Sequence, residues 1–196
     1  KNNANRWNPS LSLLNPKYLY DIKRSSSSLS EYGLTQLHNE SFSFSILNPN
    51  NNTQLIYTFS NDTFLFTDTF ILFKSLLTSN NIYGFGERGH DFKLNYGIYT
   101  IWPNDTGGIQ QDNGNGGMNG YGHQPIGLHK PACSGVFLGF IFVNTNMQDV
   151  VISKYNNNLT SLEHRTIGGV IDYYIIKGAT ADDVLRNIQY VIGVPM

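Results

Sequence analysis

The sequence predicts an all-β fold, an antiparallel sandwich or barrel with one helix at its C-terminal end. Short runs that are apolar, or that alternate between apolar and polar residues, fill most of the 196 residues, and turn-forming residues separate them. A helical pattern of apolar residues stands out in one segment near the C-terminus. Such an arrangement is typical of antiparallel sheets and not of alternating βαβ units.

Several strands are expected in the first half of the chain. Phe42, Phe44 and Ile46 alternate with serines, which indicates a strand with one buried face. The next strands are expected at residues 55–59, 63–66, 70–76 and 82–85. Turns are expected at residues 50–52 and 61–62, because Asn and Asp favour turn conformations.

The second half continues with strands and ends in the helix. Strands are expected at residues 99–102, 135–144, 148–152, 164–167 and 170–176. A helix is expected over Ala181–Ile192, because Thr180 and Asp183 can cap its first turn and Gly193 follows its last residue. Its apolar side chains share one face and therefore need a surface to pack on: Val184, Leu185, Ile188, Val191 and Ile192.

The composition indicates one folded domain and argues against several kinds of partner. A hydrophobic content of 40% excludes wholesale disorder, and 196 residues suffice for one core. Thirteen Lys and Arg against 14 Asp and Glu leave too little positive charge for binding nucleic acid or an anionic membrane. The longest apolar stretch, residues 136–143, is far shorter than the ~20 residues of a membrane-spanning helix.

The sequence contains N-glycosylation sequons, which are typical of secretory proteins, but no signal peptide. Lys1 and the polar residues after it lack the apolar run of a signal peptide, so the sequence is expected to be a mature or excised piece. Cys133 is the single cysteine and says nothing about the redox compartment. Four Asn-x-Ser/Thr sequons are candidates for N-glycosylation, although abundant Asn also produces sequons by chance: Asn39, Asn51, Asn61 and Asn158.

Several chemical motifs are incomplete. Residues 84–89 match G-x-G-x-x-G, but the strand-to-helix context of a nucleotide site is missing. The five histidines lack metal-ligand spacing and a single Cys cannot complete a zinc site, so no metal or cofactor is expected. The nucleophile motif G-x-S-x-G is absent, and the sequence alone cannot pair Asp105 with Asp112 as catalytic carboxylates.

A glycine-rich loop and the residues before it suit a polyol ligand. Residues 107–127 hold eight glycines, and a loop of that length is usually functional or disordered. Trp102, Asn104 and Asp105 precede it and combine an aromatic face, an amide and a carboxylate, which are groups that bind sugars. His123 within the loop is a further candidate contact. Plain packing is the alternative for both Trp102 and His123.

Motifs in a fixed order resemble one enzyme family. They are Tyr83-Gly84-Phe85-Gly86-Glu87-Arg88; Tyr99-Thr100-x-Trp102 with Asp105; Tyr121-Gly122-x-Gln124-Pro125; Gly135-Val136-Phe137 with Asn144-x-Asn146; and Arg165-Thr166-Ile167-Gly168-Gly169-x-Ile171-Asp172-Tyr173-Tyr174. With residues 184–195, they closely resemble the N-terminal domain of glycoside hydrolase family 31, the α-glucosidase and maltase-glucoamylase group. The resemblance covers residues 41–196 and implies a β-sandwich like that of galactose mutarotase.

The resemblance also implies a division of the chain and a role for it. Residues 41–179 would form the sandwich, residues 180–196 a helix and linker leading to a catalytic (β/α)8 barrel, and residues 1–40, which match weakly, part of the sandwich or an extended arm. The family's two catalytic Asp residues lie on the barrel, so no catalytic residue is expected here. The chain would be an accessory domain of a secreted or lysosomal retaining exo-α-glucosidase. Its partners would be the barrel, in cis or on a separate chain, and an α-glucoside or oligosaccharide.

Asp105 receives a specific role from the resemblance. It matches an Asp on a loop that reaches over the barrel mouth and helps to hold the sugar, and residues 107–120 would form the rim of the entrance. Two departures bear on this role. Asn104 opens a sequon in the same loop, where a glycan would obstruct the site, and Gln124 stands where the family often has His.

Two alternatives stay open. A non-catalytic structural or carbohydrate-binding module could retain the sandwich without the barrel, in which case the helix would dock on another protein. Aldose epimerisation would need a His acid and a Glu base in one pocket. Glu87 with His90 or His123 could supply these groups, but the sequence does not pair them.

Overall fold

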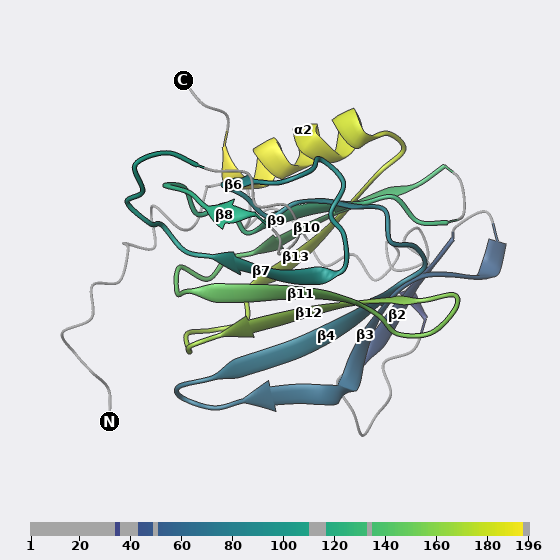
Figure 1. Ribbon diagram of the computed structural model, residues 1–196. Helices are drawn as coiled ribbons and strands as arrows, with labels where there is room; N and C mark the ends of the chain where they lie inside the picture. Colours follow the sequence, from purple (N-terminus) through teal and green to yellow (C-terminus); the bar gives the residue numbers. More distant parts are fainter. Residues whose placement is uncertain (1–33, 36–42, 49–50, 110–116, 133–134, 194–196) are drawn as a thin grey trace.

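The strands lie in two packed sheets with one helix on the outside (Figure 1). The computed structural model describes residues 34–35, 43–48, 51–109, 117–132 and 135–193. Within these ranges the ladders of both main sheets are antiparallel. The predicted all-β sandwich with a C-terminal helix is therefore confirmed.

The larger sheet has the strand order β1-β2-β3-β4-β12-β11-β7. Its strands are Leu34–Thr35 (β1), Phe44–Asn48 (β2), Asn51–Phe66 (β3), Ile71–Leu77 (β4), Gly97–Ile101 (β7), Gln148–Lys154 (β11) and Thr160–Thr166 (β12). At its centre β4 pairs with β12, so that Ile71 lies opposite Thr166 and Leu77 opposite Thr160. The sheet is thus joined in the middle by strands that are far apart in sequence.

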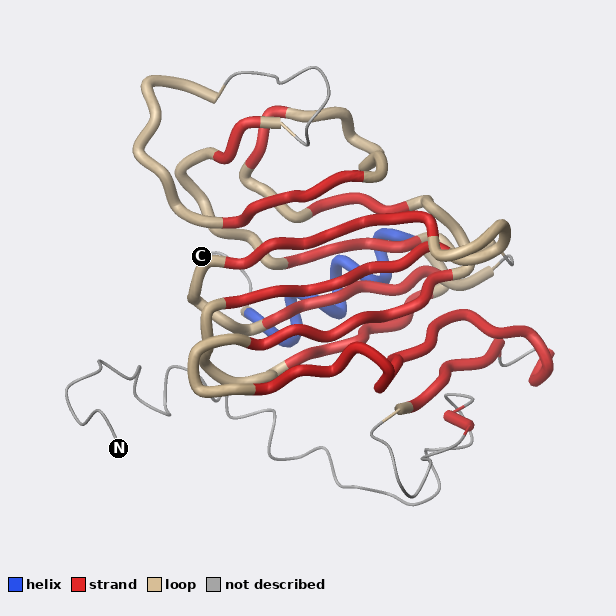
Figure 2. The backbone as a smooth tube through the Cα atoms, turned by 60° about the horizontal axis from the view of Figure 1, so that its bottom comes forward, coloured by secondary structure: helices blue, strands red, loops and turns tan. Residues whose placement is uncertain are grey.

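The smaller sheet has the order β13-β10-β9-β5. Its strands are Ile82–Gly84 (β5), Ile126–His129 (β9), Phe137–Phe142 (β10) and Tyr173–Gly178 (β13). A separate two-stranded ribbon joins Arg88–Gly89 (β6) to Met118–Asn119 (β8). Figure 2 shows this ribbon and its connecting loops beyond one edge of the larger sheet, the edge formed by β7.

The main core fills the space between the two sheets. Buried and half-buried positions alternate strictly along β4, as the period of two in a strand requires. Phe73 from β4 packs edge-on against Phe142 from β10, with ring centroids 5.1 Å apart. Tyr57 from β3 contacts Phe140 across the sandwich with the rings tilted and their centroids 5.7 Å apart. Burial of such side chains contributes on the order of 2 kcal/mol each.

Helix α2 (Ala181–Ile192) forms at the predicted residues. Its first turn has the predicted capping box: the Asp183 N–H donates to Thr180 Oγ1 (3.1 Å) and the Thr180 N–H donates to the Asp183 carboxylate (3.1 Å). After Ile192 the N–H of Gly193 donates to the Gln189 carbonyl and ends the helix. Local sequence signals therefore fix both ends.

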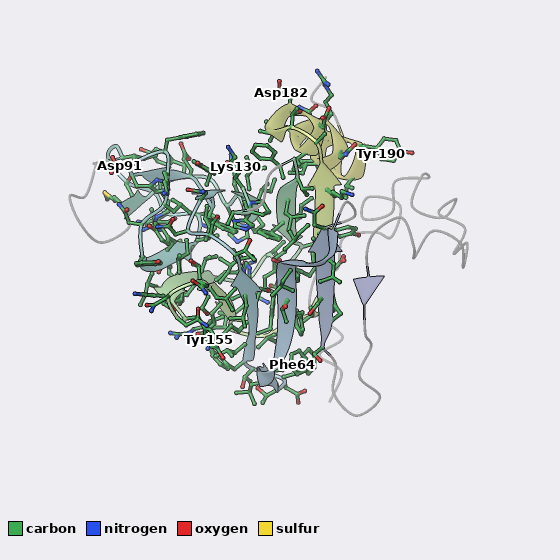
Figure 3. All side chains as sticks on the ribbon, turned by 90° about the vertical axis from the view of Figure 1, so that its right-hand side faces the viewer. Phe64, Asp91, Lys130, Tyr155, Asp182 and Tyr190 are labelled. Carbon is green, nitrogen blue, oxygen red and sulfur yellow. The ribbon has the colours of Figure 1, made fainter. Side chains whose placement is uncertain are left out.

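The surface on which α2 packs belongs to this chain. Val184 and Ile188 are buried against Ile141 on the outer face of the smaller sheet. Gly139 permits this approach, since a Cβ atom there would lie 2.6 Å from Val184 Cγ1. Tyr190, on the opposite side of the helix, extends away from the sheets (Figure 3) and is 68% exposed.

Two local predictions are wrong. Residues 61–62 do not form a turn between two strands, because β3 runs without interruption through them. The ladder absorbs the polar residues as an irregularity: Ser60 pairs with Lys74 but the next pair is Leu65 with Leu72. The expected turn at 50–52 likewise gives way to β3 from Asn51 onward, whereas residues 49–50 lie outside the described ranges.

Candidate functional site

The candidate residues lie on the loop that follows β7. Trp102, Asn104 and Asp105 are all exposed, and 46% of the Trp102 surface is accessible. Residues 102–109 contain no regular secondary structure, and Gly107 and Gly108 have no neighbours that a Cβ atom would meet. The sequence-predicted cluster is thus brought together on one exposed loop, which we call the Asp105 loop (residues 102–109).

Residues 119–121 pack against the Asp105 loop through hydrogen bonds. The Asn104 N–H donates to the Gly120 carbonyl (3.0 Å). The Asn119 amide donates to the Trp102 carbonyl, and Asn119 Oδ1 lies 3.5 Å from the Trp102 N–H. On the other side of Asp105, the Tyr121 hydroxyl donates to the Thr106 carbonyl. The segment 107–127, predicted as one loop, also contains strand residues: β8 and the first residues of β9 lie within it.

Glu87 is hydrogen-bonded to two glycines of the segment 119–122. Its backbone N–H donates to the Gly122 carbonyl (3.2 Å), and its backbone carbonyl accepts from the Gly120 N–H (2.8 Å). Its carboxylate accepts from the Gly122 N–H at 2.8 Å. A Cβ atom at Gly120 would lie 2.4 Å from Ile109 Cδ1, so any larger residue there would require the Ile109 side chain to move.

Arg88 ties the same structure to the edge of the larger sheet. Its guanidinium donates to the carbonyls of Thr100, on β7, and Gly117, next to β8. The guanidinium carbon also lies 5.8 Å from the centroid of the Tyr99 ring, within the range of a cation–π contact. A planar group with five N–H donors is suited to joining several carbonyls at once.

The arrangement presents groups that can bind a polyol. Asp105 is exposed, and Trp102 and Tyr121, on the segments that flank it, are each about half exposed. A carboxylate accepts charge-assisted hydrogen bonds from hydroxyl groups, and aromatic rings bury the C–H faces of sugars. The loop therefore has the means to bind and orient a sugar.

His123 does not share the environment of Asp105. Its ring is hydrogen-bonded to the backbone of Asn146 in the β10–β11 connection, and burial lowers its pKa. His90 contacts the carbonyl of Asp91 (2.6 Å) and packs edge-on against Tyr99. With the Glu87 carboxylate bound to the loop backbone, these groups serve packing, and the described contacts do not pair Glu87 with a histidine for epimerisation.

The glycine motif at residues 84–89 connects β5 to β6 and leads into no helix, unlike a nucleotide-binding loop. Among the described residues, no three His, Cys, Asp or Glu side chains lie close enough to hold a metal ion. Nor does any helix in these ranges have the length and apolarity needed to cross a membrane.

The sequons differ in their structural setting. Asn158 is exposed in the turn between β11 and β12, and Asn104 is exposed on the Asp105 loop. Asn51 and Asn61 lie on β3, and Asn39 lies outside the described residues. Of the four candidates, Asn158 is thus at a surface turn, where a glycan has room, whereas a glycan on Asn104 would cover the Asp105 loop.

Sequence reasoning missed the residues that hold the loop. Asn119 gave no signal, because a single Asn in a glycine-rich segment is ordinary. Glu87 and Tyr121 lie within motifs of the family resemblance, but nothing in those motifs indicates that they bind the loop. Their common function becomes visible only when residues 87, 104 and 120 meet in space.

Comparison with known proteins gives relatives of one enzymatic type. No family model matches the chain. The chain is 27% identical over 161 residues to intestinal sucrase-isomaltase of Oryctolagus cuniculus, covering 82% of this chain and 8% of the relative. It is 29% identical over 147 residues to a protein named "Probable alpha/beta-glucosidase" of Arthroderma benhamiae, covering 72% of this chain and 16% of the relative. The chain thus spans a small fraction of the relatives it matches.

Solved structures share the fold. The glucosidase II alpha subunit aligns with a TM-score of 0.61 at 12% identity, over 76% of this chain and 21% of that chain. A family 31 dextranase of Flavobacterium johnsoniae, solved with isomaltotriose, aligns with a TM-score of 0.57 at 16% identity. It covers 83% of this chain and 21% of the dextranase chain. At such identities the likeness concerns the fold alone.

Proposed function

We infer a function for this chain, starting from its similarity over most of its length to the N-terminal β-sandwich domain of glycoside hydrolase family 31. We propose that it is the accessory domain of a retaining exo-α-glucosidase. In this role it packs against a catalytic (β/α)8 barrel, in cis or on a separate chain, and lends the Asp105 loop to an active site on that barrel.

The observation that carries the proposal is the presentation of Asp105. The carboxylate lies on an exposed loop that is hydrogen-bonded on both sides to the ribbon β6–β8 and its neighbouring residues. Asp105 binds hydroxyl groups of an α-glucoside or oligosaccharide and so orients the sugar for attack at its anomeric carbon by a nucleophile on the barrel. Its contribution is positioning and not proton transfer. Asn104 remains unglycosylated in this function, because a glycan there would block the loop.

The relatives also support a compartment. One structural neighbour is named as a glucosidase II of the ER, and one relative is named as the intestinal sucrase-isomaltase. We propose that the parent protein enters the secretory pathway and functions in a lysosome or outside the cell. Asn39, Asn51, Asn61 and Asn158 stay candidates for glycosylation there.

Peptide mapping of natively purified material tests the proposal at the level of the parent protein. Peptides of a barrel with a Trp-Ile-Asp-Met-like nucleophile motif, on this chain or on one that co-purifies, are the expected result. A native C-terminus near residue 196 with no barrel partner would contradict it and favour the non-catalytic module.

Asp105→Ala in the barrel-containing protein tests the assigned residue. Loss of a carboxylate that accepts hydrogen bonds from sugar hydroxyls is expected to lower kcat/KM on maltose about tenfold or more. The matched control is Asp68→Ala, which removes an exposed carboxylate from the β3–β4 turn. Equal kcat/KM for the two variants would mean that Asp105 does not contact substrate.

A further inference from the structure

We propose that residues 119–121 form a clamp that positions the carboxylate of Asp105, with Asn119 and Tyr121 as positioning residues. The inference rests on the proposed role of Asp105 as a sugar contact and deepens it. It concerns how an exposed loop with little packing of its own is held in one conformation.

The clamp is hydrogen-bonded to the residues immediately before and after Asp105. The N–H of Asn104 donates to the Gly120 carbonyl (3.0 Å). The carbonyl of Thr106 accepts the Tyr121 hydroxyl. Because both peptide neighbours of Asp105 are bound to the same short segment, the backbone rotations that would swing its carboxylate are restrained.

Asn119 extends this grip to Trp102. Its side-chain amide donates to the Trp102 carbonyl, and its oxygen lies 3.5 Å from the Trp102 N–H. An amide group can serve a backbone N–H and C=O together, whereas most side chains of similar size cannot. Pro103 follows Trp102 and fixes its own φ angle, so little freedom is left between Trp102 and Asn104.

The clamp is anchored in turn. Glu87 makes three hydrogen bonds to Gly120 and Gly122, at 2.8, 3.2 and 2.8 Å. The neighbouring Arg88 joins Thr100 on β7 to Gly117. The contacts therefore run from the sheet edge, through the ribbon β6–β8, to both sides of Asp105, and a rigid element supports a loop that carries a binding group.

Trp102 and Tyr121 are both held in place without being buried. Trp102 is held through its backbone and Tyr121 through its hydroxyl, which leaves 46% and 50% of their surfaces exposed. About half of each residue's surface therefore remains available to a sugar bound at Asp105. The clamp thus presents the carboxylate and both rings as one preorganised unit.

Amide hydrogen exchange on this chain tests the clamp. In the double variant Asn119→Ala/Tyr121→Phe, exchange of the Asn104 amide is expected to be about tenfold faster, since the bonds on each side of Asp105 are weakened. The matched control is Asn157→Ala/Tyr155→Phe, which changes the same residue types in the exposed β11–β12 turn (Figure 3). Unchanged exchange at Asn104 would overturn the clamp. Unchanged exchange in β10 shows that the variant is folded, and Tyr121→Phe alone provides a milder variant.

Kinetics in the barrel-containing protein test the positioning role. Tyr121→Phe is expected to raise KM for maltose about fivefold while kcat stays within twofold, and Tyr121→Ala to raise KM further because the ring is also lost. Faster loop exchange with unchanged KM would overturn the positioning role. Faster loop exchange together with normal kinetics of Asp105→Asn would leave the clamp standing and reject the sugar contact, so the two failures are distinguishable.

Discussion

The most unusual single residue is His164, at the centre of the main core. Its ring stacks on Phe73 at 4.9 Å and meets Phe85, Phe142 and Tyr173 edge-on. Neither ring nitrogen has a hydrogen-bond partner among the described residues. Complete burial lowers the pKa of His164 to about 3, because the charged form would lose its hydration without compensation. The ring is therefore neutral and acts as part of the aromatic core.

Acid is expected to destabilise the fold through this residue and through His129, whose pKa burial lowers to about 4. Both pKa values lie below the ordinary 6.5, so the unfolded chain binds protons more readily. The contribution of these two histidines to the free energy of unfolding is complete above about pH 6.5 and is lost as the pH falls toward their folded pKa values. Each ring contributes a slope of ~1.4 kcal/mol per unit between about pH 6 and pH 4. Urea unfolding at a series of pH values measures the slope.

His164→Leu separates this effect from general acid denaturation. The variant keeps an apolar side chain of similar volume but cannot be protonated, so the slope between pH 6 and pH 4 should decrease by ~1.4 kcal/mol per unit. A slope equal to that of the unaltered chain would show that His164 is already charged, or accessible, in the folded state.

Among the elements, helix α2 depends most clearly on a local device. Thr180→Ala removes the hydroxyl that accepts the Asp183 N–H and is expected to cost about 1 kcal/mol in the free energy of unfolding. Urea titration of Thr180→Ala beside Thr145→Ala, an exposed threonine in the β10–β11 connection, measures the difference. Equal midpoints for both variants would mean that the capping box does not stabilise α2.

The helix and the strands differ in how far their bounds can be predicted from nearby residues. The bounds of α2 were predictable residue for residue, because the cap, the apolar face and the final glycine all lie within the helix or beside it. Strand β3 was divided wrongly, because it continues through residues 61–62 although its ladder with β4 is irregular between Ser60 and Leu65. Its pairing with β4 on both sides of this irregularity joins distant segments and leaves no mark in the local sequence. The short strands β6 and β8 gave no periodic signal at all. They consist of the pairs Arg88–Asn119 and Gly89–Met118, which join segments about 30 residues apart in sequence.

The same distinction applies to the candidate site. Asp105, Asn104 and Trp102 were predictable as a cluster, because they are consecutive or nearly so. The clamp was not, because its bonds join residues 15 and 17 positions apart and depend on Glu87 from a third segment. His123 was placed near the site by sequence and packs against Asn146 instead, since proximity along a loop does not decide the direction of a side chain.

At the scale of the whole molecule, the described residues form two apolar cores on opposite faces of the smaller sheet. Ile152 belongs to the core between the sheets, and Ile141 and Ile188 belong to the core under α2. Substitutions in different cores should act independently, whereas those in one core share neighbours. The architecture therefore predicts which pairs of substitutions are additive.

A double-mutant cycle measures this. Ile152→Val and Ile188→Val are each expected to cost about 1 kcal/mol, and their effects should add within about 0.5 kcal/mol. Ile141→Val with Ile188→Val is the comparison pair and should deviate more from additivity. Strong coupling between Ile152 and Ile188 would mean that the smaller sheet transmits strain and that the two cores behave as one.

The pairing of β4 with β12 governs how the chain can fold while it is being synthesised. The edge of β4 that faces β12 has no partner until residues 160–166 have been made. At typical rates of translation the intervening residues 78–159 take about 4–16 s. For that interval the nascent protein exposes an open strand edge, a template for pairing with other chains. Capture of the β4 edge by a chaperone or by a neighbouring nascent chain is therefore the competing event that native assembly must outpace.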